Sequence, residues 1–146
     1  MSLVTDKFFA AALTQSTSVT TAVGGRIFNT VEDEINPDDV PLPYIMIMND
    51  GTVNEAETKD DEFEGPTDTD TIRLTICADT RAALGSLAEL VRSVIQTAAQ
   101  EQDAASTAAL GFEVIDYSFS ASPVSFDDLK PCYWQDLTYR CETIYD

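Results

Sequence analysis

The sequence predicts an α+β fold: an antiparallel β-sheet with two helices packed on one face and a long acidic hairpin tip. Two observations predict this class. Expected helices and strands do not alternate regularly along the chain, and the links between neighbouring strands are hairpin-like. In addition, a length of 146 residues with 44% hydrophobic residues suits one domain, residues 1–146, without internal repeats.

The first expected element is a helix over residues 5–15. Thr5 or Asp6 offers a side-chain oxygen to the free amides of its first turn. Its apolar side chains recur at helical spacing and give one face: Phe9, Ala12 and Leu13. The Ser- and Thr-rich residues 15–22 are expected to end this helix, and a short strand is expected to begin at residues 26–28.

An acidic connection with three prolines, residues 32–43, comes next, because proline has no amide to donate to a central strand. Residues 42–48 then form an apolar run, which is typical of a strand that is covered on both faces. We expect the core to cover one face and a partner subunit the other. The residues expected to make this subunit or partner contact are Tyr44, Ile45, Met46, Ile47 and Met48.

Residues 71–77 alternate between polar and apolar side chains and form the clearest strand of the sequence. They are expected to pair with residues 42–48 as a hairpin. The intervening residues 51–69 are acidic and have few aliphatic side chains, so burial cannot offset their ordering entropy. We therefore expect a mobile acidic loop outside the folded core. The acids of this loop and its ends are Asp50, Glu55, Glu57, Asp60, Asp61, Glu62, Glu64, Asp68 and Asp70.

A second helix is expected from residue 80 to about Ala99, with Asp79 or Thr80 as its cap. Its apolar residues lie three and four positions apart on one face: Leu84, Leu87, Leu90, Val91, Val94 and Ile95. Of these, three are expected to face the sheet: Leu87, Leu90 and Val94. This pattern makes the segment the strongest helix of the sequence.

Two further strands are expected, over residues 112–120 and 132–144, with a turn-rich connection over residues 125–131. The last strand alternates between two kinds of side chain. One face carries Tyr133, Gln135, Leu137, Tyr139 and Cys141, and the other carries Trp134, Asp136, Thr138, Arg140 and Glu142.

The formal net charge is −18, from 26 acids and 8 bases, with no histidine. Residues 32–70 hold fourteen of the acids and one base, Lys59, so most of the excess charge lies in one segment. Such a field repels phosphates, so we expect no specific nucleic-acid binding. The simplest interpretation of the segment is a solvated loop that keeps the protein soluble.

The sequence predicts no catalytic site and no cofactor. Without histidine there is no Ser-His-Asp triad, and Gly24-Gly25 lacks the rest of a phosphate-binding loop. Three cysteines without close spacing, Cys77, Cys132 and Cys141, favour reduced and buried thiols. No apolar run approaches the roughly 18 residues that span a bilayer, so no membrane association is expected.

One acidic spacing is compatible with a calcium loop. Asp60, Glu62, Glu64 and Gly65 match positions 1, 3, 5 and 6 of an EF-hand. The bidentate glutamate of that motif is replaced by Thr71, and no helices flank the segment. We therefore expect no specific metal site, while weak screening of the loop by divalent ions stays open.

Two short motifs, VGGRIF at residues 23–28 and VPLPYI at residues 40–45, lie between an alanine-rich first helix and a strand–helix pair. In motifs, element order and element lengths, nearly the whole chain resembles the tail completion, or tail terminator, family of long-tailed phages and prophages. The chain departs from that pattern in its long acidic hairpin, Asp50 to Asp70.

The resemblance implies a non-enzymatic virion structural protein. Such proteins cap the tail tube, typically as a hexameric ring, and join it to the head connector. The implied partners are copies of the same chain, the tail-tube protein and the head connector protein, and the implied locations are the virion tail and, during assembly, the host cytoplasm. The acidic loop would then face the lumen of the ring or dock on a partner.

Other classes of function stay open at this point. A head–tail connector protein would occupy the neighbouring ring of the same particle. An acidic DNA mimic would inhibit a host DNA-binding protein, although a mimic is expected to spread its carboxylates over a rigid surface and not over a loop. An enzyme is disfavoured because histidine and catalytic motifs are missing.

Overall fold

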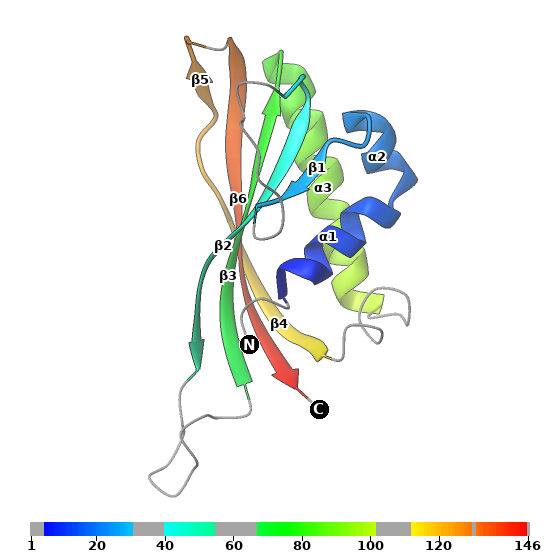
Figure 1. Cartoon of the computed structure of the whole chain (residues 1–146), viewed down its shortest axis with the longest axis vertical. Helices are drawn as coiled ribbons and strands as arrows, with labels where there is room; N and C mark the ends of the chain where they lie inside the picture. Colours follow the sequence, from blue (N-terminus) through cyan, green and yellow to red (C-terminus); the bar gives the residue numbers. More distant parts are fainter. Residues whose placement is uncertain (1–4, 31–39, 55–66, 102–111, 130, 146) are drawn as a thin grey trace, which may run out of the picture.

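The computed structural model describes residues 5–30, 40–54, 67–101, 112–129 and 131–145. Within these residues, three helices lie beside one long twisted sheet (Figure 1). In chain order the elements are α1 (Thr5–Gln15), α2 (Thr17–Val23), β1 (Ile27–Asn29), β2 (Tyr44–Asn54), β3 (Thr67–Ala78), α3 (Arg81–Glu101), β4 (Phe112–Ala121), β5 (Ser125–Asp127) and β6 (Cys132–Tyr145).

The sheet has the strand order β1-β2-β3-β6-β4, and β5 pairs with the start of β6 on the same edge as β4. All neighbouring strands are antiparallel except β1 and β2, which are parallel. The predicted α+β class is therefore confirmed, and the sheet is mixed at one edge. A short turn between β1 and β2 would have made them antiparallel. Instead, the chain crosses back between the two strands, so β1 and β2 run in the same direction.

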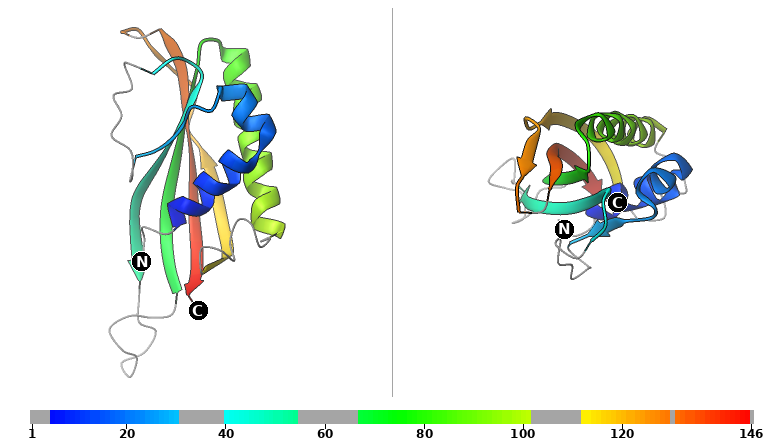
Figure 2. Two further views of the ribbon diagram at one scale, coloured as in Figure 1. Left: turned by 45° about the vertical axis from the view of Figure 1, so that its right-hand side comes forward. Right: turned by 90° about the horizontal axis from the view of Figure 1, so that it is seen from above.

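All three helices lie on one face of the sheet, as the two views of Figure 2 show. The main core fills the space between them. It contains side chains from α1, α2 and α3 and the inward side chains of β2, β3 and β6. Its largest fully buried members are Tyr139, Phe8, Phe9, Leu13, Ile45, Ile47, Ile72, Leu74, Ile76, Leu84, Ile95 and Leu137. None of the described helices is long and apolar enough to cross a lipid bilayer.

The first helical region differs from the expectation in that a separate helix, α2, follows α1. Ser16 is its N-cap, with its hydroxyl accepting a hydrogen bond from the amide of Val19 at 3.3 Å. Gly24 ends it in the left-handed conformation, with φ of 60°. Val19 and Val23 lie one turn apart and are completely buried, so the core stabilises a Ser- and Thr-rich helix of low intrinsic propensity.

Helix α3 begins where expected, and the Thr80 hydroxyl accepts a hydrogen bond from the amide of Ala83 at 3.1 Å. Its buried face differs in part from the prediction. The completely or almost completely buried side chains are Leu84, Leu87, Val91 and Ile95. Leu90 and Val94 are only half-buried at the edge of the core, because the helix presents a narrower stripe to the sheet than the apolar pattern suggests.

This difference predicts unequal effects of two matched substitutions on α3. Leu84→Ala is expected to lower the free energy of unfolding by about 2–4 kcal/mol, because it opens a cavity in a closed core. Leu90→Ala is expected to lower it by about 1 kcal/mol, since solvent reaches that site. Urea denaturation measures both, and equal losses would contradict the burial of α3 described above.

The hairpin of β2 and β3 is longer than the sequence predicts. The residue pair Asn54 and Asp68 is still in register, so residues 51–54 and 67–69 belong to paired strands and not to a loop. A register shift between Asn49 and Gly51 lets β2 continue beyond its apolar part. The turn-rich connection over residues 125–131 also contains a short strand, β5.

Candidate subunit and partner interface

The apolar run of β2 contributes to both faces of the sheet. Ile45 and Ile47 point into the main core and are completely buried. Tyr44, Met46 and Met48 point to the opposite face, which carries no helix among the described residues. The alternation of side chains along a strand therefore divides the five residues of the predicted contact between the two faces. On the open face, Tyr44 and Met46 are buried within the sheet surface, and Met48 is partly exposed.

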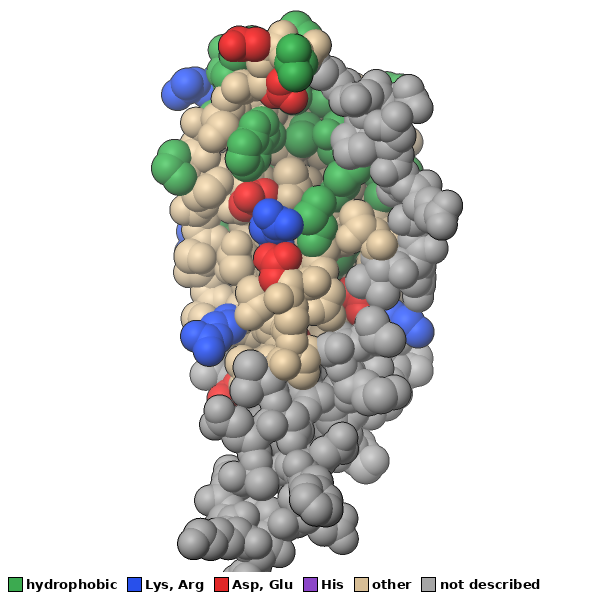
Figure 3. Space-filling view, turned by 60° about the vertical axis from the view of Figure 1, so that its left-hand side comes forward, with side chains coloured by type: hydrophobic (Ala, Val, Ile, Leu, Met, Phe, Trp, Pro, Cys, Tyr) green, Lys and Arg blue, Asp and Glu red, His purple; other side chains and the backbone are tan. Residues whose placement is uncertain are grey.

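The helix-free face holds a second apolar group, which we term the open-face cluster. Its members are Phe28, Val40, Leu42, Tyr44, Met46, Met48, Cys77 and Trp134. Strand pairing assembles it, because Tyr44 lies opposite Cys77 and Cys77 lies opposite Trp134. Figure 3 shows hydrophobic side chains gathered over this part of the molecule. Phe28, Leu42, Met48 and Trp134 are only partly buried, so the cluster presents apolar surface outward.

A charged group borders the open-face cluster. The Arg73 guanidinium lies 3.3 Å from a carboxylate oxygen of Asp50 and 3.7 Å from one of Asp136. Asp136 also accepts a hydrogen bond from the Thr75 hydroxyl at 2.7 Å. Because Arg73 and Asp50 are both more than a third exposed, these pairs contribute little to stability. They mark the boundary between apolar surface and the acidic end of the hairpin.

The acidic side chains singled out from the sequence fall into three groups. Asp50 lies in β2 and pairs with Arg73, and Asp68 lies in β3 opposite Asn54. Six of them lie outside the described residues: Glu55, Glu57, Asp60, Asp61, Glu62 and Glu64. The calcium-loop alternative falls on the same segment. Among the residues that the structure describes, no group of three or more metal-binding side chains occurs.

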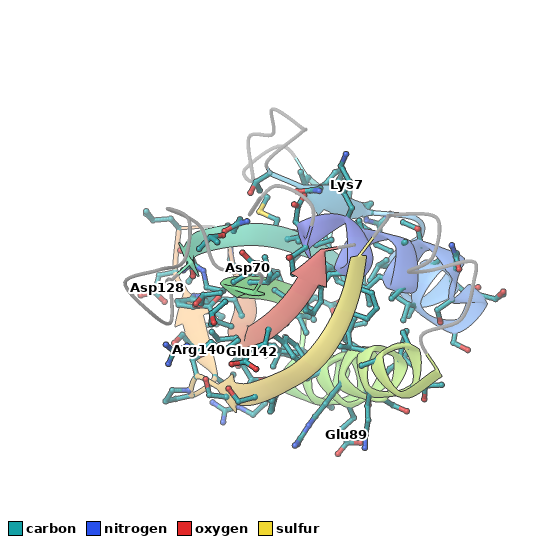
Figure 4. The ribbon with its side chains drawn as sticks, turned by 90° about the horizontal axis from the view of Figure 1, so that it is seen from below. Lys7, Asp70, Glu89, Asp128, Arg140 and Glu142 are labelled. Carbon is teal, nitrogen blue, oxygen red and sulfur yellow. The ribbon has the colours of Figure 1, made fainter. Side chains whose placement is uncertain are left out.

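Asp70 differs from the other acids, because it is completely buried and cannot belong to a surface loop. Its carboxylate accepts hydrogen bonds from the hydroxyls of Thr5 and Thr52. Next to Thr5, the completely buried Asp6 accepts a hydrogen bond from the Asn29 side chain. Figure 4 shows Asp70 in the interior, near the start of α1, whereas Glu89 points away from the outer side of α3. The two buried acids thus attach the start of α1 to the sheet instead of serving as surface charge.

Since strand pairing extends to Asn54 and Thr67, we expect the folded core to be independent of residues 55–66. Replacing this segment with Asn-Gly should shift the melting temperature by less than about 4 °C, because the acidic segment has few apolar side chains to bury and a short loop closes easily. Differential scanning calorimetry measures the shift. A loss of cooperative unfolding would show that the segment packs on the domain.

The tip of the β5–β6 hairpin was missed by the sequence analysis. Its Phe126 is 51% exposed and its Leu129 is 98% exposed, and these are the exposed large hydrophobic side chains of the described residues. The signal in the sequence was Leu129, an apolar residue between two acids and a proline. Because such a segment is typical of an ordinary turn, it did not indicate an exposed apolar side chain. All three cysteines are buried and none forms a disulfide, as expected.

Comparison with known proteins identifies the family. The family model of the tail completion protein gp17 matches residues 9–123. The chain belongs to the tail completion protein family. The match begins in α1 and continues through β4, so it includes the strands that carry most of the open-face cluster.

Membership places the chain among the structural proteins of the phage tail, in association with other tail or virion proteins. A chain of a solved structure, "Virion of native gene transfer agent (GTA) particle", has a similar fold, with a TM-score of 0.62. It is 14% identical, and the similarity covers 97% of both chains, so it shows a shared fold over the whole length. Among curated proteins, none matches the sequence significantly.

Proposed function

We propose that this tail completion protein caps the end of the tail tube as a ring of identical subunits, six in number, and joins the tube to the head connector. The observation that carries the proposal is the open-face cluster, on a sheet face that no described helix covers. A protein that stays in solution until the tail is complete needs such a surface for its partner. Family membership supports the tail as the place of action.

The chemistry of the face suits binding and not catalysis. Trp134 and Met48 offer partly buried, adaptable apolar surface of the kind that is enriched at interface centres. The adjoining pair of Arg73 and Asp50 offers a polar rim, which sets orientation more than affinity. The role requires no catalytic group and no cofactor, and it places the protein in the host cytoplasm before assembly.

Complementation of a phage that lacks the gene tests this function. Without the protein, heads and tails should accumulate separately in electron micrographs, and addition of the purified chain should restore joined particles. Trp134→Asp should fail to restore them, because it places a charge in the open-face cluster. Glu89→Ala, on the outer side of α3, is the matched control and should restore them fully.

Two results would contradict the proposal. Joined particles that form without the protein would exclude a completion role. Recovery of the protein on isolated heads, before any tail is present, would assign it to the connector instead.

A further inference from the structure

The β5–β6 hairpin presents an exposed apolar side chain, Leu129, at its tip. The Asp127 carboxylate accepts a hydrogen bond from the amide of Leu129 at 2.9 Å, which shapes the turn. Behind the turn, the rings of Phe126 and Tyr133 lie 5.0 Å apart, and the Arg81 guanidinium lies 5.5 Å from the Tyr133 ring centre. The backbone that carries the leucine is therefore supported, so an interface has to order mainly the leucine side chain itself.

An apolar groove lies elsewhere on the same molecule, at the junction of α2 and α3. It has a volume of about 260 Å³ and is lined by Ala22, Pro43, Ala83, Ser86, Leu87 and Leu90. The lining side chains of α3 recur at helical spacing, and Leu90 is the half-buried residue that the core leaves at its edge. The groove is large enough for one leucine side chain.

The charges beside the two features are opposite. Arg26 lies at the groove, because its Nε donates a hydrogen bond to the carbonyl of Pro43 at 2.9 Å. Within the described part of the chain, no carboxylate forms a salt bridge with this guanidinium. The tip carries Asp127 and the exposed Asp128 before its leucine and Lys130 after it, so its formal net charge is −1. The apolar Leu129 thus matches the apolar lining of the groove, and the acids beside it match the positive charge of Arg26.

The tip and the groove also lie in different directions. Figure 1 shows β5 and α2 on opposite sides of the upper end of the molecule, and the view from above in Figure 2 agrees. Two different, complementary patches on one chain make a head-to-tail contact, which closes into a ring when the rotation between copies permits. A self-complementary dimer would need one patch that meets itself.

We propose that the occupant of the groove is the Leu129 tip of a second copy of this chain, and that this head-to-tail contact joins neighbouring subunits of the ring. This inference rests on the proposed function, because it assigns the contact between neighbouring subunits of the proposed ring. The open-face cluster then stays available for the other tail proteins.

Two variants, alone and mixed, test the contact. Leu129→Asp removes the apolar tip and leaves the groove intact, whereas Ser86→Trp fills the groove and leaves the tip intact. Both sites are exposed, so circular dichroism and melting temperatures should match the wild type. In sedimentation at the salt concentration where the wild type assembles, each variant alone should associate roughly thirtyfold more weakly than the wild type.

The 1:1 mixture is the decisive sample. It retains one functional tip and one functional groove on different chains, so it should form heterodimers and nothing larger. Glu89→Ala, on the outer side of α3, is the matched control and should assemble like the wild type. Wild-type assembly by either single variant, or a mixture that stays monomeric, would overturn the tip-and-groove contact while the proposed function stands. A wild type that stays monomeric even with tail tubes present would overturn both.

Discussion

Replacing Phe9 with alanine is expected to lower the free energy of unfolding by about 3–5 kcal/mol, because it removes a completely buried ring from the contact between α1 and the sheet. The Phe9 ring lies 5.2 Å from Tyr139 of β6, and Tyr139 lies 5.1 Å from Phe119 of β4. These rings connect the first helix to the far edge of the sheet. Such a loss is a large part of the stability of a single domain, about 5–15 kcal/mol.

The melting temperature of Phe9→Ala should fall by roughly 10–20 °C. Phe126→Ala is the matched control, because Phe126 also stacks on a tyrosine but is half-exposed at the hairpin tip. It should change the free energy of unfolding by less than about 1 kcal/mol. A loss below about 1 kcal/mol for Phe9→Ala would mean that α1 does not dock on the sheet as described.

Self-association is expected to strengthen as salt rises. Each subunit carries −18, so a ring of six brings together −108. At roughly 0.01 M salt the screening length is ~30 Å, and charges repel across a whole subunit. At roughly 0.15 M it is ~8 Å, and only close charges still interact. The protein should therefore be monomeric in dilute buffer and form larger species with salt, with divalent ions or on the tail tube.

A loop variant separates charge repulsion from other effects of salt. Replacement of residues 55–66 with Asn-Gly removes six acids and Lys59, so the net charge changes from −18 to −13. This variant should assemble at lower salt than the wild type, whereas an uncharged Gly/Ser segment fused at the C-terminus should change nothing. Light scattering across a salt series measures both. Association that weakens as salt rises would show that attractive ion pairs hold the subunits together.

Local sequence patterns predicted much of the fold because they report which side of an element is buried. In β6, Leu137, Tyr139 and Cys141 are buried in the main core, and Trp134 joins the open-face cluster, as the alternation indicates. The same alternation, extended backward from Ile72, places Asp70 on the core side of β3. Its acidic neighbours concealed this signal, because a run of acids indicates a solvated loop.

The remaining features depend on contacts between distant parts of the chain. The parallel pairing of β1 with β2 joins residues separated by helix packing and a connection, which no local pattern reports. Helix α2 is stabilised by its two buried valines, although its Ser16 cap and Gly24 end were visible in the sequence. The groove between α2 and α3 likewise exists only once both helices are packed.

The measurement that tests the central claim most directly is electron microscopy of purified tail tubes with and without this protein. We expect added density at one end of each tube, and averaged end views should show a closed ring of six copies. The same preparation with Trp134→Asp should leave the tube ends bare. Tubes that carry no added density, or density along their whole length, would contradict a capping ring.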